Sequence, residues 1–130
     1  MDISVHDNRI KSYSVFSYTR EIIIHTEYKE IEPFENIDIL FSDVVIYHFE
    51  SDNFNNIIFD IVEEELEHTL KQYDCLFAKL KNHGWLEFQY ESEQDLIIKL
   101  KQLKVKSFVI QSSNGLNGFV WAKKMEIKYN

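Results

Sequence analysis

The apolar residues of this chain repeat with two different periods, and the change occurs near residue 62. Before that point they alternate, as in strands with one buried face; after it they recur every three or four residues, as on one face of a helix. The alternating part predicts strands over residues 9–17, 21–28, 37–49 and 57–62. We interpret them as a four-stranded meander, with a bulge at Ser42 and Asp43, where the alternation is interrupted.

A helical period follows the fourth strand. Its apolar stripe consists of Leu66, Leu70, Tyr73, Phe77 and Leu80. Four glutamates near the beginning of this stripe and basic residues near its end suit the dipole of one helix, which Gly84 can close. A second helix is predicted after Ser92, which has N-cap spacing to Asp95; its apolar stripe is Leu96, Leu100 and Leu103.

The last part of the chain predicts a hairpin. Residues 107–112 and 119–129 flank a turn over 113–118 that contains two Asn-Gly pairs. On the last strand we expect one shared face for Phe119, Trp121, Met125, Ile127 and Tyr129, interrupted by Lys123. Residues 85–90 have strand-like composition but are too few to assign, and residues 29–36 are expected to form an exposed connection.

These elements predict one α+β domain over residues 1–130. Its sheet is expected to be antiparallel, with about five or six strands and two helices packed on one face, because a bare sheet must cover its apolar side. Glycine is scarce: there are three glycines and one proline, and two of the glycines fall in the predicted hairpin turn. This scarcity excludes the glycine-rich loops of nucleotide-binding folds, and we expect no cofactor.

The chain has the features of a cytoplasmic protein. No apolar run is long enough to span a membrane, and the first residues lack the basic and apolar regions of a secretory signal. Cys75 is the single cysteine, so no internal disulfide can form. We therefore expect a cytoplasmic location and no contact with membranes.

The net charge of −8 is distributed unevenly. Residues 1–70 hold 16 acids and 4 bases, whereas residues 71–130 hold 6 acids and 10 bases. An acidic field disfavours nucleic acid and attracts basic proteins, although acidity also serves solubility alone. The candidate partner-binding acidic face consists of Glu27, Glu30, Glu32, Glu35, Asp43, Glu50 and Asp52.

The histidines offer an alternative site. The five histidines are not spaced as local metal ligands, so we expect no metal. A small enzyme or ligand-binding domain would have to assemble its site from distant residues; the candidates are His6, Asp7, His25 and His48. No nucleophile in a recognisable context accompanies them, so a catalytic role is the weaker hypothesis.

Three short stretches of the chain resemble sequences of known small bacterial proteins. The first is Val5-His6-Asp7-Asn8-Arg9-Ile10. The second is Phe59-Asp60-Ile61, preceded by Asn55-Asn56-Ile57, and the third is the run from Ser112 to Lys123. Together they resemble proteins of the polymorphic-toxin immunity type, which bind and block a cognate toxin in the cytoplasm. The resemblance implies that His6, Asp7 and the turn between Gly115 and Gly118 matter, and it assigns no site residue.

The sequence therefore favours a non-enzymatic protein-binding domain, most simply an immunity-type protein that neutralises a basic toxin through its acidic face. The small enzyme described above is the first alternative. A homo-oligomeric structural subunit is the second, because the many Phe and Tyr residues could supply an apolar face for self-association.

Overall fold

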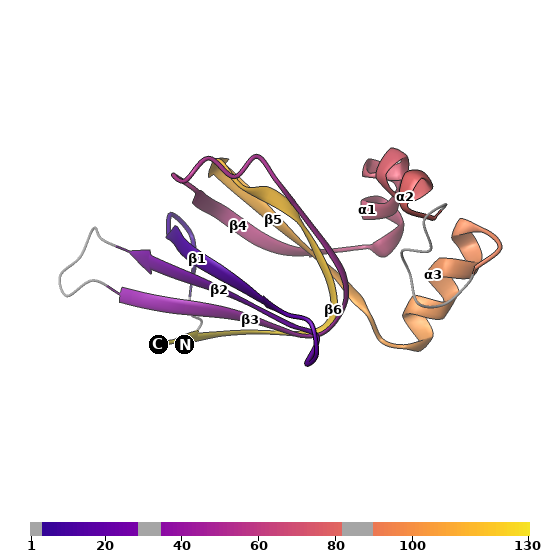
Figure 1. Cartoon of the computed structure of the whole chain (residues 1–130), viewed down its shortest axis with the longest axis horizontal. Helices are drawn as coiled ribbons and strands as arrows, with labels where there is room; N and C mark the ends of the chain where they lie inside the picture. The colour runs from indigo at the N-terminus through magenta and orange to yellow at the C-terminus, as the bar shows by residue number, and fades with distance from the viewer. Residues whose placement is uncertain (1–3, 29–34, 82–89) are drawn as a thin grey trace.

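The computed structural model describes residues 4–28, 35–81 and 90–130. Six strands and three helices lie in these ranges (Figure 1). The strands are β1 (Arg9–Phe16), β2 (Glu21–Tyr28), β3 (Glu35–Glu50), β4 (Ile57–Glu64), β5 (Lys106–Asn114) and β6 (Asn117–Tyr129). The helices are α1 (Leu66–Gln72), α2 (Asp74–Lys81) and α3 (Glu93–Gln102).

The strands form one closed antiparallel barrel in the order β1-β2-β3-β6-β5-β4. The predicted strands and the final hairpin are confirmed, and so is the α+β class with a six-stranded antiparallel sheet. The four-stranded meander is wrong beyond its third strand. β3 pairs with β6 along nearly its whole length, and β4 lies instead between β5 and β1.

The seam between β1 and β4 is short. Arg9 and Ile57 are the only registered pair of these two strands among the described residues. Backbone hydrogen bonds extend the seam: the Ile10 amide donates to the Asn56 carbonyl and the Ile58 amide to the Asn8 carbonyl, each at 2.9 Å, and the Asp7 amide donates to the Ile58 carbonyl at 2.8 Å. Within the described residues, the rest of β1 is registered with no strand on this edge, so the described strands close the barrel tightly at one end.

The third strand is irregular, but the bulge is not where the sequence predicts it: Ser42 and Val44 keep one register with β6, and the register shift lies between Val44 and Ile46. Phe41 and Val44 both point into the barrel, although strict alternation would place them on opposite faces. Between them Asp43 has a φ of +53°, a left-handed conformation that Asp tolerates better than most residues. The change of face bends β3, and beyond it the Val44 amide donates to the Arg20 carbonyl at 2.9 Å.

The barrel interior is filled by branched apolar side chains. Alternation places Ile22, Ile24 and Thr26 of β2 inside, as the sequence predicts, and all three are essentially inaccessible to solvent. The interior apolar cluster is made of Val5, Ile10, Ile22, Ile24, Ile37, Ile39, Phe41, Val44, Ile58, Phe108, Ile110, Leu116, Val120 and Ala122.

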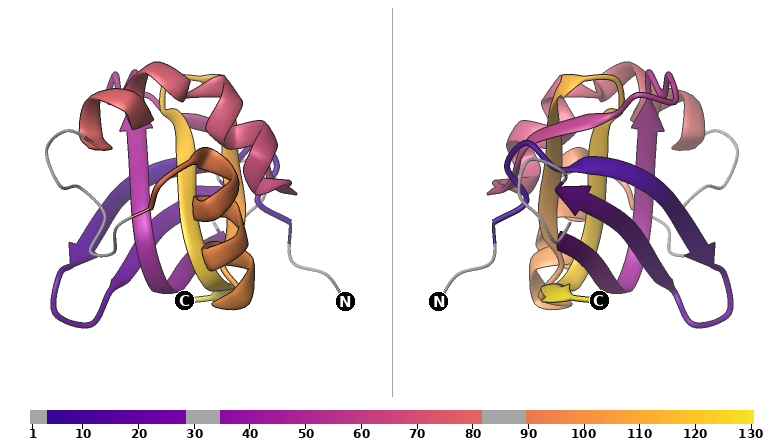
Figure 2. Two further views of the ribbon diagram at one scale, coloured as in Figure 1. Left: turned by 90° about the vertical axis from the view of Figure 1, so that its right-hand side faces the viewer. Right: turned by 90° about the vertical axis from the view of Figure 1, so that its left-hand side faces the viewer.

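A second cluster joins the helices to the outer face of the sheet. Phe119 and Trp121 of β6 point outward into it, and Phe77 of α2 stacks on Trp121 with ring centroids 4.8 Å apart. In the left view of Figure 2, α3 lies in front of β5 and β6. The predicted single face of the last strand is therefore wrong. Met125 and Ile127 pack against the interior cluster, because the faces exchange at Lys123 and Lys124, at the level of Ser42 in β3.

The first helical stripe is confirmed, but it belongs to two helices. α1 ends at Tyr73, whose φ of −111° and ψ of 30° are not helical, and α2 begins at the next residue. The N-cap of α3 forms as predicted, with the Ser92 hydroxyl accepting from the Asp95 amide at 3.1 Å. Leu103 lies after the end of this helix and is largely exposed, unlike the rest of its predicted stripe.

Three helices therefore accompany the sheet in the described ranges, where two were expected. None of them is long and apolar enough to cross a membrane. The predicted end of the first helix at Gly84 and the strand-like residues 85–89 lie outside the described residues, as do residues 29–34 of the predicted connection; Glu35 and Asn36 belong to β3.

One buried polar contact ties the helical cluster to the sheet and leads to a prediction. The Trp121 indole N–H donates to the Ser107 hydroxyl at 3.0 Å, and that hydroxyl lies 2.6 Å from the Thr69 hydroxyl. Replacing Ser107 by Ala should lower the free energy of unfolding by about 1–3 kcal/mol, because the indole N–H would stay buried without an acceptor. Urea denaturation followed by circular dichroism measures the loss.

The matched control is Ser113→Ala, an exposed serine of the same strand. It should change the free energy of unfolding by less than about 0.5 kcal/mol. Equal losses in the two variants would show that the buried contact contributes nothing of its own.

Candidate functional site

A groove of about 410 Å³ opens between the β1–β2 hairpin and the second half of β3. We call it the β1–β3 groove; its lining residues are Val15, Phe16, Ser17, Arg20, Glu21, Ile22, Val44, Val45, Ile46 and Tyr47. Apolar side chains of the barrel wall, among them Val15, Phe16 and Tyr47, are exposed to solvent in it.

The groove exists because β2 is much shorter than β3. The β2–β3 ladder stops at the pair Ile22–Phe41, whereas the β3–β6 ladder continues to Glu50. Beyond the register shift between Val44 and Ile46, β3 is therefore paired along one edge only, as far as the described strands go. The hairpin stays near the beginning of this free edge through the hydrogen bond between Val44 and Arg20.

Aromatic side chains line the far end of the opening. The Tyr13 ring meets Phe49 edge to face, and Phe49 in turn contacts Tyr47, with centroids 5.2 Å apart in both pairs. Tyr13 and Tyr47 lie on the inward side of their strands and are still more than a third exposed. Val15 and Phe16 are exposed by 42% and 45%, so apolar surface at the groove meets solvent.

Acidic residues lie in the chain segments that flank the groove, and Glu21 is the acid among its lining residues. Residues 13–22 and 43–54 together hold four acids, Glu21, Asp43, Glu50 and Asp52, and one base, Arg20. The Tyr13 hydroxyl donates to Asp52 at 3.4 Å. Burial, and next the Asp52 charge, raise the pKa of Tyr13 above its ordinary value, so this phenol stays neutral at physiological pH.

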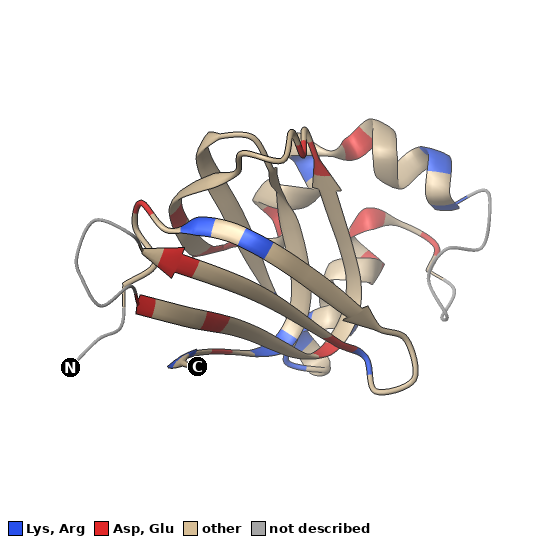
Figure 3. Ribbon diagram, turned by 60° about the vertical axis from the view of Figure 1, so that its left-hand side comes forward, with Lys and Arg blue, Asp and Glu red and all other residues tan. Residues whose placement is uncertain are grey.

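The predicted acidic face is divided by the fold. Glu27 and Glu35 lie at one end of the β2–β3 ladder, whereas Glu50 lies about 50 Å further along β3 at 3.3 Å per residue, and Asp52 follows the end of that strand. Asp43 lies between them, two residues after Phe41, the last residue of β3 in that ladder. Glu30 and Glu32 lie outside the described residues. In Figure 3 the acidic segments are spread over separate strand ends and helices, with basic segments between them.

The candidate histidines do not converge in the structure. Each one has a carboxylate nearby: His6 lies 3.4 Å from Asp7, His25 lies 2.7 Å from Asp38, and His48 lies 3.3 Å from Glu50. Asp38 and His48 are ten residues apart on β3, about 33 Å along the strand. His6 belongs to the segment before β1, where its Nδ1 lies 2.6 Å from the Phe59 carbonyl of β4. No three metal-ligating side chains meet anywhere in the described residues.

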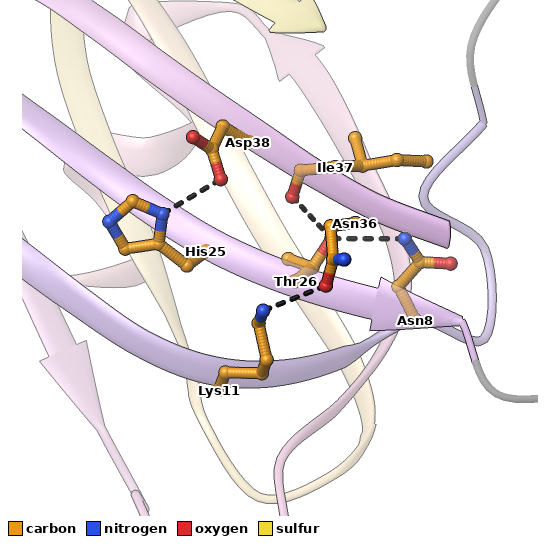
Figure 4. Close-up of polar contacts among 7 residues, drawn as sticks. All are labelled: Asn8, Lys11, His25, Thr26, Asn36, Ile37 and Asp38. Carbon is orange, nitrogen blue, oxygen red and sulfur yellow. Dashed lines mark hydrogen bonds and ion pairs between the residues drawn. The ribbon is translucent and has the colours of Figure 1, made fainter. Parts of the chain in front are cut away.

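The polar contacts across β1, β2 and β3 stabilise the barrel (Figure 4). Inside it, the Asn8 amide donates to the Thr26 hydroxyl at 3.0 Å, and that hydroxyl donates to the Ile37 carbonyl at 2.7 Å. On the outside, Lys11 reaches Asn36 across β2 at 2.8 Å. These bonds link three strands next to the short β1–β4 seam, at the closed end of the barrel.

The hairpin turn has a structural explanation. Gly115 has a φ of +86°, and a Cβ there would collide with the Asn56 side chain. The Asn56 carboxamide oxygen accepts from the Leu116 amide at 2.9 Å and from the Asn53 amide at 3.2 Å. A Cβ on Gly118 would collide with the His48 carbonyl of β3. The two glycines therefore let the turn approach the loop after β3 and β3 itself.

The apolar residues of the groove have no signal in the sequence that separates them from core residues. Val15 and Tyr47 occupy inward strand positions, and only the length difference between β2 and β3 leaves them open to solvent. Glu21 lines the groove but is not among the residues of the predicted acidic face. It is the first residue of β2, whose other residues have the pattern of a core strand.

Comparisons with protein-family models, with curated proteins and with solved structures find no match for this chain.

Asp52 provides a test of the loop that ends the groove. Its carboxylate accepts from the Asn56 side chain at 2.8 Å and from the Phe54 amide at 3.1 Å, and these bonds lower its pKa below the ordinary 3.8. Because the folded pKa is lowered, the charge stabilises the fold above the unfolded pKa, and this stabilisation is lost as the pH falls through the folded pKa.

We therefore expect Asp52→Asn to be less stable than the wild type above about pH 5, and the difference to shrink below that pH. Urea denaturation over a pH series measures the difference, and the carboxyl carbon shift of Asp52 reports its titration directly. A stability difference that stays constant with pH would contradict the assigned role of the charge.

Proposed function

We propose that this chain is a non-enzymatic protein-binding domain and that its partner docks on the β1–β3 groove. The observation that carries the proposal is the coincidence, at one place, of exposed apolar side chains, a half-paired strand and a border of acids. Protein-binding surfaces combine an apolar centre with a charged rim in this way.

The apolar and acidic parts have different tasks. Burying Val15, Phe16 and Tyr47 under a partner supplies affinity at about 25 cal/mol per Å². The acids are exposed to water, so each contributes less than about 1 kcal/mol to a docked complex. Their collective field, together with the net charge of −8, accelerates encounter with a basic partner.

The biological role that we propose is that of an immunity-type protein, which neutralises a basic toxin in the cytoplasm of the cell that makes it. The resemblance of three sequence stretches to such proteins supports this role, and the acidic border of the groove suits a basic partner. The enzymatic alternative lacks an observation in its favour, because the candidate histidines lie at separate places on the barrel.

The test pairs the chain with the protein encoded by the gene next to its own. Growth of cells that express this neighbour should be restored by the chain. The double variant Glu21→Lys/Glu50→Lys should bind the neighbour at least about tenfold more weakly, since two rim charges are reversed. Raising NaCl from about 50 to about 500 mM should slow wild-type association, as screening predicts.

The control variant is Glu63→Lys/Glu91→Lys, which makes the same change in net charge at two exposed glutamates outside the groove. It should bind like the wild type. Equal weakening by both variants would assign the effect to net charge alone, and a neighbour that neither binds nor is neutralised would overturn the immunity role. Binding unaffected by either variant would place the partner elsewhere on the surface.

A further inference from the structure

The second half of β3 presents a free strand edge. From Ile46 to Glu50 the strand is registered with β6 on one side, and no described strand is registered on the other. Each residue of a strand carries an N–H and a C=O, and alternate residues direct them to opposite edges. About half of the backbone groups of these five residues therefore point to the side of the β1–β3 groove.

This edge lacks the usual protection against strand pairing. Exposed edges normally carry lysine or proline, or are interrupted by a bulge. Between residues 43 and 50 there is neither lysine nor proline, and the register shift against β6, between Val44 and Ile46, comes before the free part. Five residues span about 17 Å, which is the length of an ordinary strand. The edge is therefore long enough to pair with a further strand.

The surroundings of the edge point to the chemistry of that strand. Val15, Phe16 and Tyr47 line the groove side and offer apolar contact to every second side chain of an added strand. The segments that border the groove hold four acids against one base, which favours lysine or arginine in the added strand. The aromatic rings of Tyr18 and Phe54, in the hairpin turn and in the loop after β3, are 104% and 93% exposed.

We propose that the partner inserts an extended segment of alternating apolar and basic residues into the β1–β3 groove, where it adds as a strand to the free edge of β3. The inference rests on the proposed protein-binding function and specifies how recognition takes place. Main-chain hydrogen bonds supply affinity in this mode, and alternate side chains supply specificity.

The probe is a capped peptide of about eight residues that alternates valine and lysine, the length that covers the free edge. Binding is followed by amide shifts of the 15N-labelled chain. Two isomers carry N-methyl groups on alternate residues, so that each loses the donors of one edge. The shifts should centre on residues 45–50, and one isomer should bind at least about tenfold more weakly than the other, because several hydrogen bonds are lost in only one of them.

Two variants test whether the peptide binds in the β1–β3 groove. Tyr47→Lys places a charge on the groove wall at a residue that is 39% exposed, and it should weaken peptide binding about tenfold. Tyr129→Lys makes the same exchange at a residue of β6 that is 54% exposed and lies outside the groove, and it should leave binding unchanged.

Other results would overturn strand addition. Equal binding of the two N-methylated isomers, shifts centred outside residues 45–50, or no shifts at millimolar peptide would each exclude it. A dimer of the chain in sedimentation that the peptide does not dissociate would assign the edge to a second copy. If the neighbouring protein binds and these peptide tests fail, the protein-binding function stands and only its mode is wrong.

Discussion

The structure depends on the ladder between β3 and β6. β6 follows β3 from Ile37 to Glu50, whereas β2 accompanies only the first half of that strand. The barrel is consequently held on both sides of β3 near its beginning and on one side near its end. The change of face in β3 at Asp43 and the exchange of faces at Lys123 and Lys124 occur at the same level, and the register shift between Val44 and Ile46 follows directly, so both strands bend together. The opening between β1 and β3 follows directly from this unequal pairing.

Local structure could be predicted from the sequence because its causes are local. Alternation placed β1 and β2 within a residue of their observed ends, and the Ser92 cap located the start of α3. Strand neighbours could not be predicted, since alternation reports which side of a strand is buried and not which strand lies next to it. The error on β6 had a visible signal: two consecutive lysines, Lys123 and Lys124, mark a place where no single alternation can hold.

Only part of the candidate site could be predicted from the sequence by the same reasoning. Asp43, Glu50 and Asp52 could be found from charge alone, and they border the groove. Val15 and Phe16 could not be found in this way. They are exposed because a neighbouring strand ends beside them, and their own residue types do not indicate where that strand ends. The histidines illustrate the opposite case. Each has a carboxylate close by, so their number in the sequence suggested a shared site that the fold does not assemble.

The distance in sequence between β3 and its main partner also affects how the protein is made. While the ribosome synthesises residues 51–116, β3 has been made but β6 has not. During this interval the nascent chain can form the β1–β2–β3 ladder, but the outer edge of β3 and the apolar residues Ile39, Phe41 and Ile46 have no lasting cover. Completion of the barrel is thus a late event in translation, and the nascent chain is most in need of chaperones just before β6 emerges.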